Sequence, residues 1–225
     1  MSDSVLQQHV PYPATEARRL PGMQILAPRD WLAFDEAEAA QCALRRRLLG
    51  ERRAEVLAAM PGTEVLQAEA CAVISAHLAR DHGRPGVARF EDLAGMVQED
   101  VILLEKRDGA HVMVAALLCF PASWTLAEKI GRPIARIHAP VAAIDARMDA
   151  MIEAVFAAVT QARPLWRYNQ LWYRDPALFQ PRREGDPRGH EAGDYLRTER
   201  QCLVRMPSGA LLFTIHTYVV HRDDL

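Results

Sequence analysis

The C-terminal half of the chain carries five apolar runs whose length and spacing predict β-strands. They cover residues 101–105, 111–120, 165–173, 195–206 and 210–220, with turn-forming residues between them. Asp108-Gly109 predicts a tight hairpin between the first two runs. Apolar residues at helical spacing over 142–161 separate the second run from the third. This order predicts an antiparallel sheet made of a hairpin, a helical crossover and a three-stranded meander.

The N-terminal half predicts helices instead of strands. Helical spacing extends over residues 35–60, with a break expected near Gly50, and again over residues 63–78. We therefore expect three parts: an extended, proline-rich arm over 1–34, a helical extension over 35–95 and a sheet domain over 96–225. The fold class is α+β, and the sheet domain has the element order of a PAS-like fold, with five antiparallel strands and crossover helices.

Charge, cysteine spacing and motifs exclude several classes of function. The 225 residues carry a net charge of −2, so there is no basic excess to suggest a nucleic-acid partner. The four cysteines form no C-x-x-C pair, which argues against a zinc ribbon, an iron–sulfur cluster and c-type haem attachment. No glycine-rich nucleotide motif is present. Because the start lacks a basic and apolar leader and no apolar stretch approaches about 20 residues, we expect a cytoplasmic protein without a membrane partner.

A histidine after a short helix is the strongest single candidate for chemistry. Thr125 and Glu128 stand at capping-box spacing, and Gly131 with a following proline ends the helix. His138 then lies in an apolar, proline-limited segment. Haem needs one axial side chain and an apolar pocket, which this placement fits, although a buried histidine bonded to a backbone carbonyl fits it too. Three other residues are weaker candidates for an axial ligand: His111, His216 and Cys119.

The last hairpin predicts one apolar face and one polar face. If Ser208 and Gly209 form the turn, Glu199 stands opposite Tyr218 and Gln201 stands opposite His216. The polar face is either an ordinary solvent-facing surface or the lining of a site. A slip of one residue would exchange the two faces.

Short motifs along most of the chain resemble a known family. They are Trp31–Asp35, Val97–Glu105, Cys119–Trp124, Leu126–Pro133, Ile137–Val141, Trp166–Asn169, Asp175–Pro181, Arg197–Gln201 and Phe213–Tyr218. In order and spacing they resemble the haem-dependent oxidative N-demethylases. The resemblance implies a haem b bound in a PAS-like domain and oxidative removal of a methyl group from a small amine as formaldehyde. It also implies O2 and electrons from a separate flavin and iron–sulfur protein.

The resemblance and the predicted polar face together suggest roles for six residues. We expect His138 to bind the iron, Glu199 to hold the cationic amine and accept its proton, and Tyr218 to stand opposite Glu199. The other cofactor-binding candidates are Arg197 and Arg200, for the haem propionates, and Trp124. The alternative function is a haem-based PAS sensor of gas or redox state. A sensor normally needs an output module, and no part of the sequence resembles one.

Overall fold

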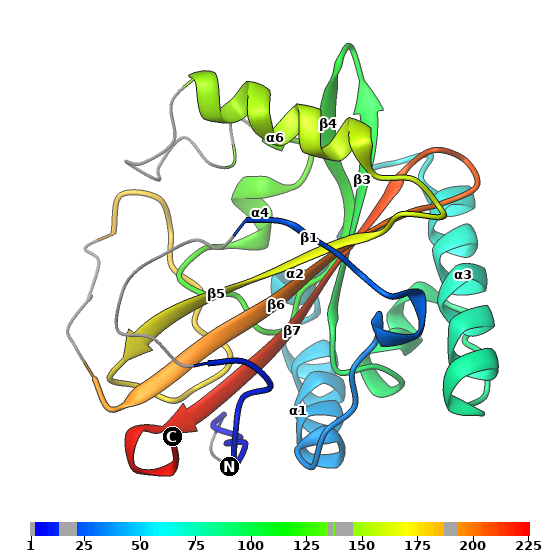
Figure 1. Cartoon of the computed structure of the whole chain (residues 1–225). Helices are drawn as coiled ribbons and strands as arrows, with labels where there is room; N and C mark the ends of the chain where they lie inside the picture. The colour runs from blue at the N-terminus through cyan, green and yellow to red at the C-terminus, as the bar shows by residue number, and fades with distance from the viewer. Residues whose placement is uncertain (1–2, 14–21, 135–136, 138–145, 187–192) are drawn as a thin grey trace.

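The computed structural model shows a seven-stranded antiparallel sheet with helices on both sides (Figure 1). It describes residues 3–13, 22–134, 137, 146–186 and 193–225. The strands are β1 (Gln24–Ile25), β2 (Leu57–Ala59), β3 (Asp100–Arg107), β4 (Ala110–Leu117), β5 (Leu165–Tyr173), β6 (Tyr195–Arg205) and β7 (Leu211–His221). The helices are α1 (Glu38–Glu51), α2 (Arg53–Val56), α3 (Glu64–His82), α4 (Leu126–Lys129) and α6 (Ala146–Ala158), with 3-10 turns at Pro28–Asp30, Phe90–Gly95 and Arg222–Asp224.

The five predicted strands are confirmed, and they form the centre of the sheet. The order is β1-β5-β6-β7-β3-β4-β2, and every pair is antiparallel. The hairpin between β3 and β4 turns at Asp108 and Gly109, whose φ angles are 48° and 89°. Two successive positive φ angles match the twist of antiparallel strands, which explains why this dipeptide favours the turn. The α+β class is therefore confirmed, and the sheet has two edge strands more than predicted.

The break expected near Gly50 is confirmed, but the helical pattern predicted as far as residue 60 is wrong at its C-terminal end. α1 ends at Glu51, and Arg52 leaves the helical region with φ −133°. Leu57 then pairs with Leu117 as strand β2, and Leu118 donates its N–H to the Val56 carbonyl at 2.7 Å. Hydrogen bonds to the open edge of β4 outweigh the helical pattern of this segment.

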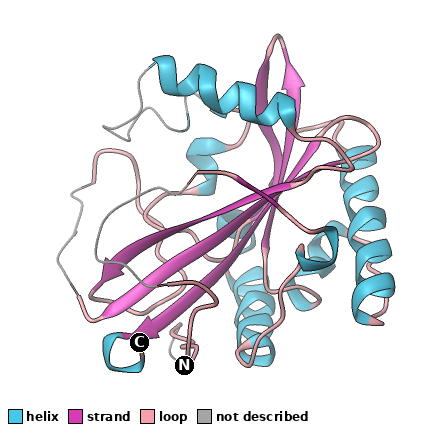
Figure 2. Cartoon of the chain, viewed as in Figure 1, coloured by secondary structure: helices cyan, strands magenta, loops and turns pink. Residues whose placement is uncertain are grey.

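Two apolar clusters lie on opposite faces of the sheet. On one face, Ile74 and Leu78 of α3 pack with Leu103 and Leu212, and we call it the α3 face. On the other face, Phe156 of α6 packs against a cluster that alternates with the first along the strands, and we call it the α6 face. That second cluster includes Ile102, Leu104, Leu203, Leu211 and Ile215. The helical layers on the two sides are visible in Figure 2. The predicted helical extension therefore shares a core with the sheet, and the domain boundaries remain a prediction.

The described part of the N-terminal arm lies against the sheet. The Gln7 N–H donates to the Val219 carbonyl, and its side-chain oxygen accepts from the Val219 N–H, both at 2.9 Å. Tyr12 stacks on Tyr168 of β5, with ring centroids 3.9 Å apart. Among the described residues, no helix has the length and apolar character needed to cross a bilayer.

Candidate functional site

The register of the last hairpin decides which side chains can share a site. Arg200 pairs with His216, and Glu199 pairs with Thr217. The predicted pairing of Glu199 with Tyr218 is therefore wrong by one residue. The cause is the turn, which spans three residues from Pro207 to Gly209, with the Met206 N–H bonded to the Ala210 carbonyl at 2.9 Å. Gly209 has a φ of 93°, the left-handed residue that such three-residue loops require.

A row of four polar side chains crosses β5 and β6 on the α6 face. The members of this polar row are Arg167, Asn169, Glu199 and Gln201. Arg167 Nε donates to Gln201 Oε1 at 2.8 Å, and Gln201 Nε2 donates to Glu199 Oε2 at 3.1 Å. Asn169 Nδ2 donates to the same Glu199 oxygen at 2.8 Å. Two amides therefore orient the Glu199 carboxylate through one oxygen.

The polar row holds charges that are not paired directly. Within the described residues, neither Arg167 nor Glu199 forms an ion pair, although only 8% of Glu199 is exposed. Burial lowers the pKa of Arg167, and the nearby Glu199 carboxylate opposes that shift. Thr217 stands opposite Glu199, and its buried hydroxyl has no hydrogen-bond partner in the described part of the chain. Such groups are costly to bury unless a ligand or water completes them.

An apolar wall adjoins the polar row on the same face. Ile215 of β7 and Leu203 of β6 belong to a buried cluster against which Phe213 and Ile137 pack. The Ile137 carbonyl accepts a hydrogen bond from Lys129 Nζ at 3.2 Å. The chain that leads into His138 is thus anchored on the α6 face, while His138 itself lies outside the described residues. An apolar wall with a half-buried guanidinium and an unpaired carboxylate fits a flat apolar cofactor that has ionised edges and a polar substrate beside it.

The remaining predicted site residues do not lie together in the polar row. Trp124 packs against the α6-face cluster. Arg197 donates to the carbonyls of Phe120 and Leu178 at 2.7 and 3.0 Å. Its guanidinium therefore joins the segment after β4 to the segment after β5.

Arg200 and Tyr218 lie on the α3 face, across the sheet from Glu199. Arg200 donates to the Trp31 carbonyl at 2.8 Å and lies over the Trp166 ring. Tyr218 meets Tyr12 edge to face, with ring centroids 6.1 Å apart. Both side chains hold the N-terminal arm, so the structure brings neither of them to the polar row.

A buried charge cluster on the α3 face was not predicted. His216 lies between two carboxylates, with Nε2 3.1 Å from Asp35 Oδ2 and Nδ1 3.3 Å from Glu99 Oε1. Burial works to lower the pKa of His216, but hydrogen bonds to both carboxylates raise it above its ordinary value. The matching effect lowers the pKa of Asp35 to about 2, against the opposing effect of burial. The only available indication in the sequence was the strand alternation that puts His216 and Tyr218 on one face.

Of the two other predicted alternatives for an axial ligand, His111 lies far from the polar row and Cys119 favours the neutral thiol. His111 is held by Glu153, with Nδ1 2.6 Å from Oε2, and its buried Nε2 has no hydrogen-bond partner in the described part of the chain. His111 pairs with Lys106, six positions along β3 from Asp100, which aligns with Gln201 through Ile215. At about 3.3 Å per residue and 4.8 Å per strand, that places His111 roughly 25 Å away. Burial raises the pKa of the Cys119 thiol to about 12, which disfavours a thiolate. Within the described residues, no group of three or more His, Cys, Asp and Glu side chains could hold a metal ion.

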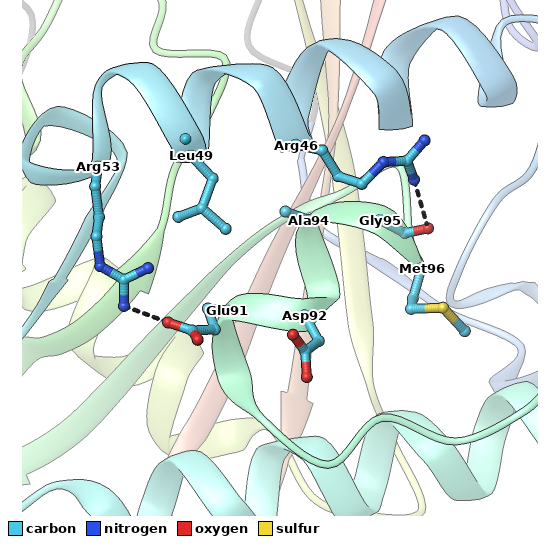
Figure 3. A pocket seen from close by; sticks show the side chains of 9 residues that line it. Arg46, Leu49, Arg53, Glu91, Asp92, Ala94, Gly95 and Met96 are labelled. Carbon is cyan, nitrogen blue, oxygen red and sulfur yellow. Dashed lines mark hydrogen bonds and ion pairs between the residues drawn. The ribbon is translucent and has the colours of Figure 1, made fainter.

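A surface hollow between α1 and the 3-10 turn at Phe90–Gly95 is separate from the polar row. Figure 3 shows Arg53 paired with Glu91 at one end and Arg46 bonded to the Gly95 carbonyl at the other. Its lining includes none of the four polar-row residues. The polar contacts across the hollow are one solvated ion pair and one exposed hydrogen bond, so we give it no part in the chemistry.

Residues 86–225, more than half of the chain, match the family model described as haem-dependent oxidative N-demethylase, alpha subunit-like. The match covers the five central strands, α4, α6 and the whole polar row. It agrees with the family suggested by the short motifs. The chain therefore belongs to the haem-dependent oxidative N-demethylase, alpha subunit-like family.

Proposed function

We propose that this chain is the haem-binding catalytic subunit of an oxidative N-demethylase acting on a small methylated amine. The single observation that carries the proposal is the polar row beside an apolar wall, within the region that matches the family. In the overall reaction, a methylamine, O2, two electrons and two protons give the demethylated amine, formaldehyde and water. One oxygen atom goes to the methyl carbon and the other to water.

The cofactor in this proposal is a haem b in a PAS-like domain. The order β5-β6-β7-β3-β4 of the central strands and the α4–α6 connection between β4 and β5 support that fold. Haem would supply the activation of O2, and His138 would bind its iron through a neutral imidazole. Trp124 and the apolar wall would contact the flat faces of the haem and exclude water.

Glu199 is the residue that we assign to the substrate. A small amine is mostly protonated near neutral pH, and bringing that cation to an apolar surface is costly without a counter-charge. Glu199 supplies the charge, and it can accept the ammonium proton before the methyl group is oxidised. Asn169 and Gln201 hold its carboxylate in place. Tyr218 lies on the opposite face, which favours a role in holding the arm.

The electrons would come from a separate flavin and iron–sulfur protein. The chain carries no cysteine pair and no nucleotide motif for either group. A cytoplasmic setting, as expected from the sequence, would supply such a reductase. The proposal therefore requires a partner to which this subunit exposes one edge of the haem.

The visible spectrum of the purified protein tests the proposal. With adequate haem supply the protein should show a Soret band, and His138→Ala should abolish or shift it, while His9→Ala at an exposed position should leave it unchanged. A methylated amine, O2 and a surrogate electron donor should then give one formaldehyde per O2 consumed. A spectrum without a haem band would contradict the proposal. A haem spectrum that changes on binding of a gas, in a protein that oxidises no amine, would favour the sensor function instead.

A further inference from the structure

The half-buried Arg167 of β5 differs from Arg197 and Arg200, the two buried arginines of β6. In Arg197 and Arg200, both terminal nitrogens donate to backbone carbonyls. Arg167 uses only Nε, in its bond to Gln201. Within the described residues, both of its terminal nitrogens are without a partner, although the side chain is half-buried.

The amide of Gln201 keeps Arg167 and Glu199 apart. Its oxygen accepts from Arg167 at 2.8 Å, and its nitrogen donates to Glu199 at 3.1 Å. The polar row therefore presents a cation at one end and a carboxylate at the other, without neutralising either. A guanidinium has a planar pair of N–H groups that matches a carboxylate in two parallel hydrogen bonds. The guanidinium of Arg167 is partly desolvated, and its two terminal N–H groups have no partner among the described residues. It can therefore bind the carboxylate of a ligand.

We propose that Arg167 binds a ligand carboxylate at the end of the site opposite Glu199. The proposal rests on the function proposed above for the position of the site, and it deepens that function by naming the group bound. Two sources can supply a carboxylate here: a propionate of the haem, or a substrate that carries an acid as well as an N-methyl group. Thr217 stands beside Glu199, and its hydroxyl, which has no partner in the described part of the chain, can supply a further hydrogen bond to the amine end of such a substrate.

Three variants and two ligands separate the sources. Arg167→Gln removes the charge, and Arg167→Lys keeps the charge but lacks the planar pair of N–H groups. Arg163→Gln, the matched control, removes an exposed charge just before β5. Haem dissociation constants are measured by titration of the Soret band, with haem whose propionates are esterified as a second cofactor. Binding of N-methylglycine and of dimethylamine is measured by calorimetry on the same proteins.

The outcomes point to one source or overturn the proposal. If a propionate is the ligand, Arg167→Gln weakens haem binding by about tenfold or more, Arg167→Lys recovers part of it, and esterified haem binds wild type and Gln variant alike. If a substrate acid is the ligand, haem binding is unchanged, but the wild-type preference for N-methylglycine over dimethylamine disappears. Values that match the Arg163→Gln control in both assays overturn the proposal.

Failure of the proposed function can be told apart from failure of this inference. Wild-type protein that never binds haem contradicts the proposed function alone. The calorimetric comparison of N-methylglycine with dimethylamine still decides the inference on that protein. Binding of N-methylglycine that Arg167→Gln abolishes supports the carboxylate role, and absence of binding to wild type refutes it.

Discussion

Replacing Asp100 by Asn should destabilise the protein severely, because Asp100 is the counter-ion of a fully buried arginine. Its Oδ1 accepts from Arg45 Nη1 at 2.6 Å and from the Cys119 N–H at 2.7 Å, while Oδ2 accepts from the Phe120 N–H at 3.0 Å. The side chains of Arg45 and Asp100 are 0% and 1% exposed. An asparagine keeps one acceptor oxygen but turns an amide N–H₂ toward groups that themselves donate.

The expected magnitude follows from burial. Removing one partner of a buried ion pair leaves the other charge uncompensated, which costs about 3–5 kcal/mol. A domain of this size is stable by about 5–15 kcal/mol in total, so Asp100→Asn should remove a large part of it. Arg45→Met should also destabilise, and the double variant should cost clearly less than the sum of the two single changes, since the two side chains are in contact.

Urea unfolding followed by far-ultraviolet circular dichroism measures the change. The midpoint should fall while the slope stays constant, which is the mark of altered stability without altered compactness. Glu91→Gln is the matched control, because Glu91 pairs with Arg53 at the surface and exposed pairs contribute only about 0–1 kcal/mol. A loss below about 1 kcal/mol for Asp100→Asn would refute the claim that this pair is excluded from water.

Three further predictions concern the buried charge cluster on the α3 face, the segment before the axial ligand, and the substrate. Because the pKa of His216 is raised, its pairing with Asp35 should stabilise the protein below about pH 6.5 and lose that effect as pH rises through the folded pKa. His216→Gln should therefore flatten the pH profile of unfolding. Lys129→Met should shift the Soret band and weaken haem binding, because Lys129 anchors the Ile137 carbonyl beside the proposed ligand. Glu199→Gln should lower the rate of formaldehyde production by about 10²-fold or more while haem binding stays unchanged.

Each of the three has a result that would count against it. Wild type and His216→Gln with parallel stability curves between pH 5 and 9 would show that the histidine does not titrate with folding. A Soret band of normal position and affinity in Lys129→Met would remove the anchoring role. Wild-type kinetics in Glu199→Gln, over a full range of amine concentrations, would rule out its contact with the substrate.

The elements that could be predicted are those that the chain specifies locally. Long apolar runs gave the five central strands, and Asp108-Gly109 gave the hairpin because its backbone angles suit that turn. β2 could not be found in this way, since Leu57–Ala59 continues a helical pattern and becomes a strand only by pairing with β4. The same holds for β1, a strand of two residues held by β5. Short edge strands depend on the neighbour that they join.

The candidate site was predictable only as far as individual residues. Glu199 emerged from strand alternation, and alternation also puts Arg167 and Asn169 on one face of β5. The predicted meander makes β5 and β6 neighbours, but nothing in the sequence shows the register that aligns Asn169 with Glu199. Without that register, the sequence does not distinguish Arg167 from any other arginine on a strand, so its role could not be predicted.

The register of β6 and β7 shows how one residue in a turn decides the chemistry of a site. A two-residue turn would set Tyr218 opposite Glu199, and a phenol would then stand next to the proposed substrate. The three-residue turn that ends at Gly209 sets Thr217 there instead, and it sends Tyr218 to the face that holds the arm. Lengthening or shortening a strand would leave these neighbours unchanged, but one extra loop residue shifts every pairing, because side chains alternate with a period of two. The group beside the carboxylate is therefore a small buried hydroxyl that has no hydrogen-bond partner in the described part of the chain, where a two-residue turn would place a tyrosine ring.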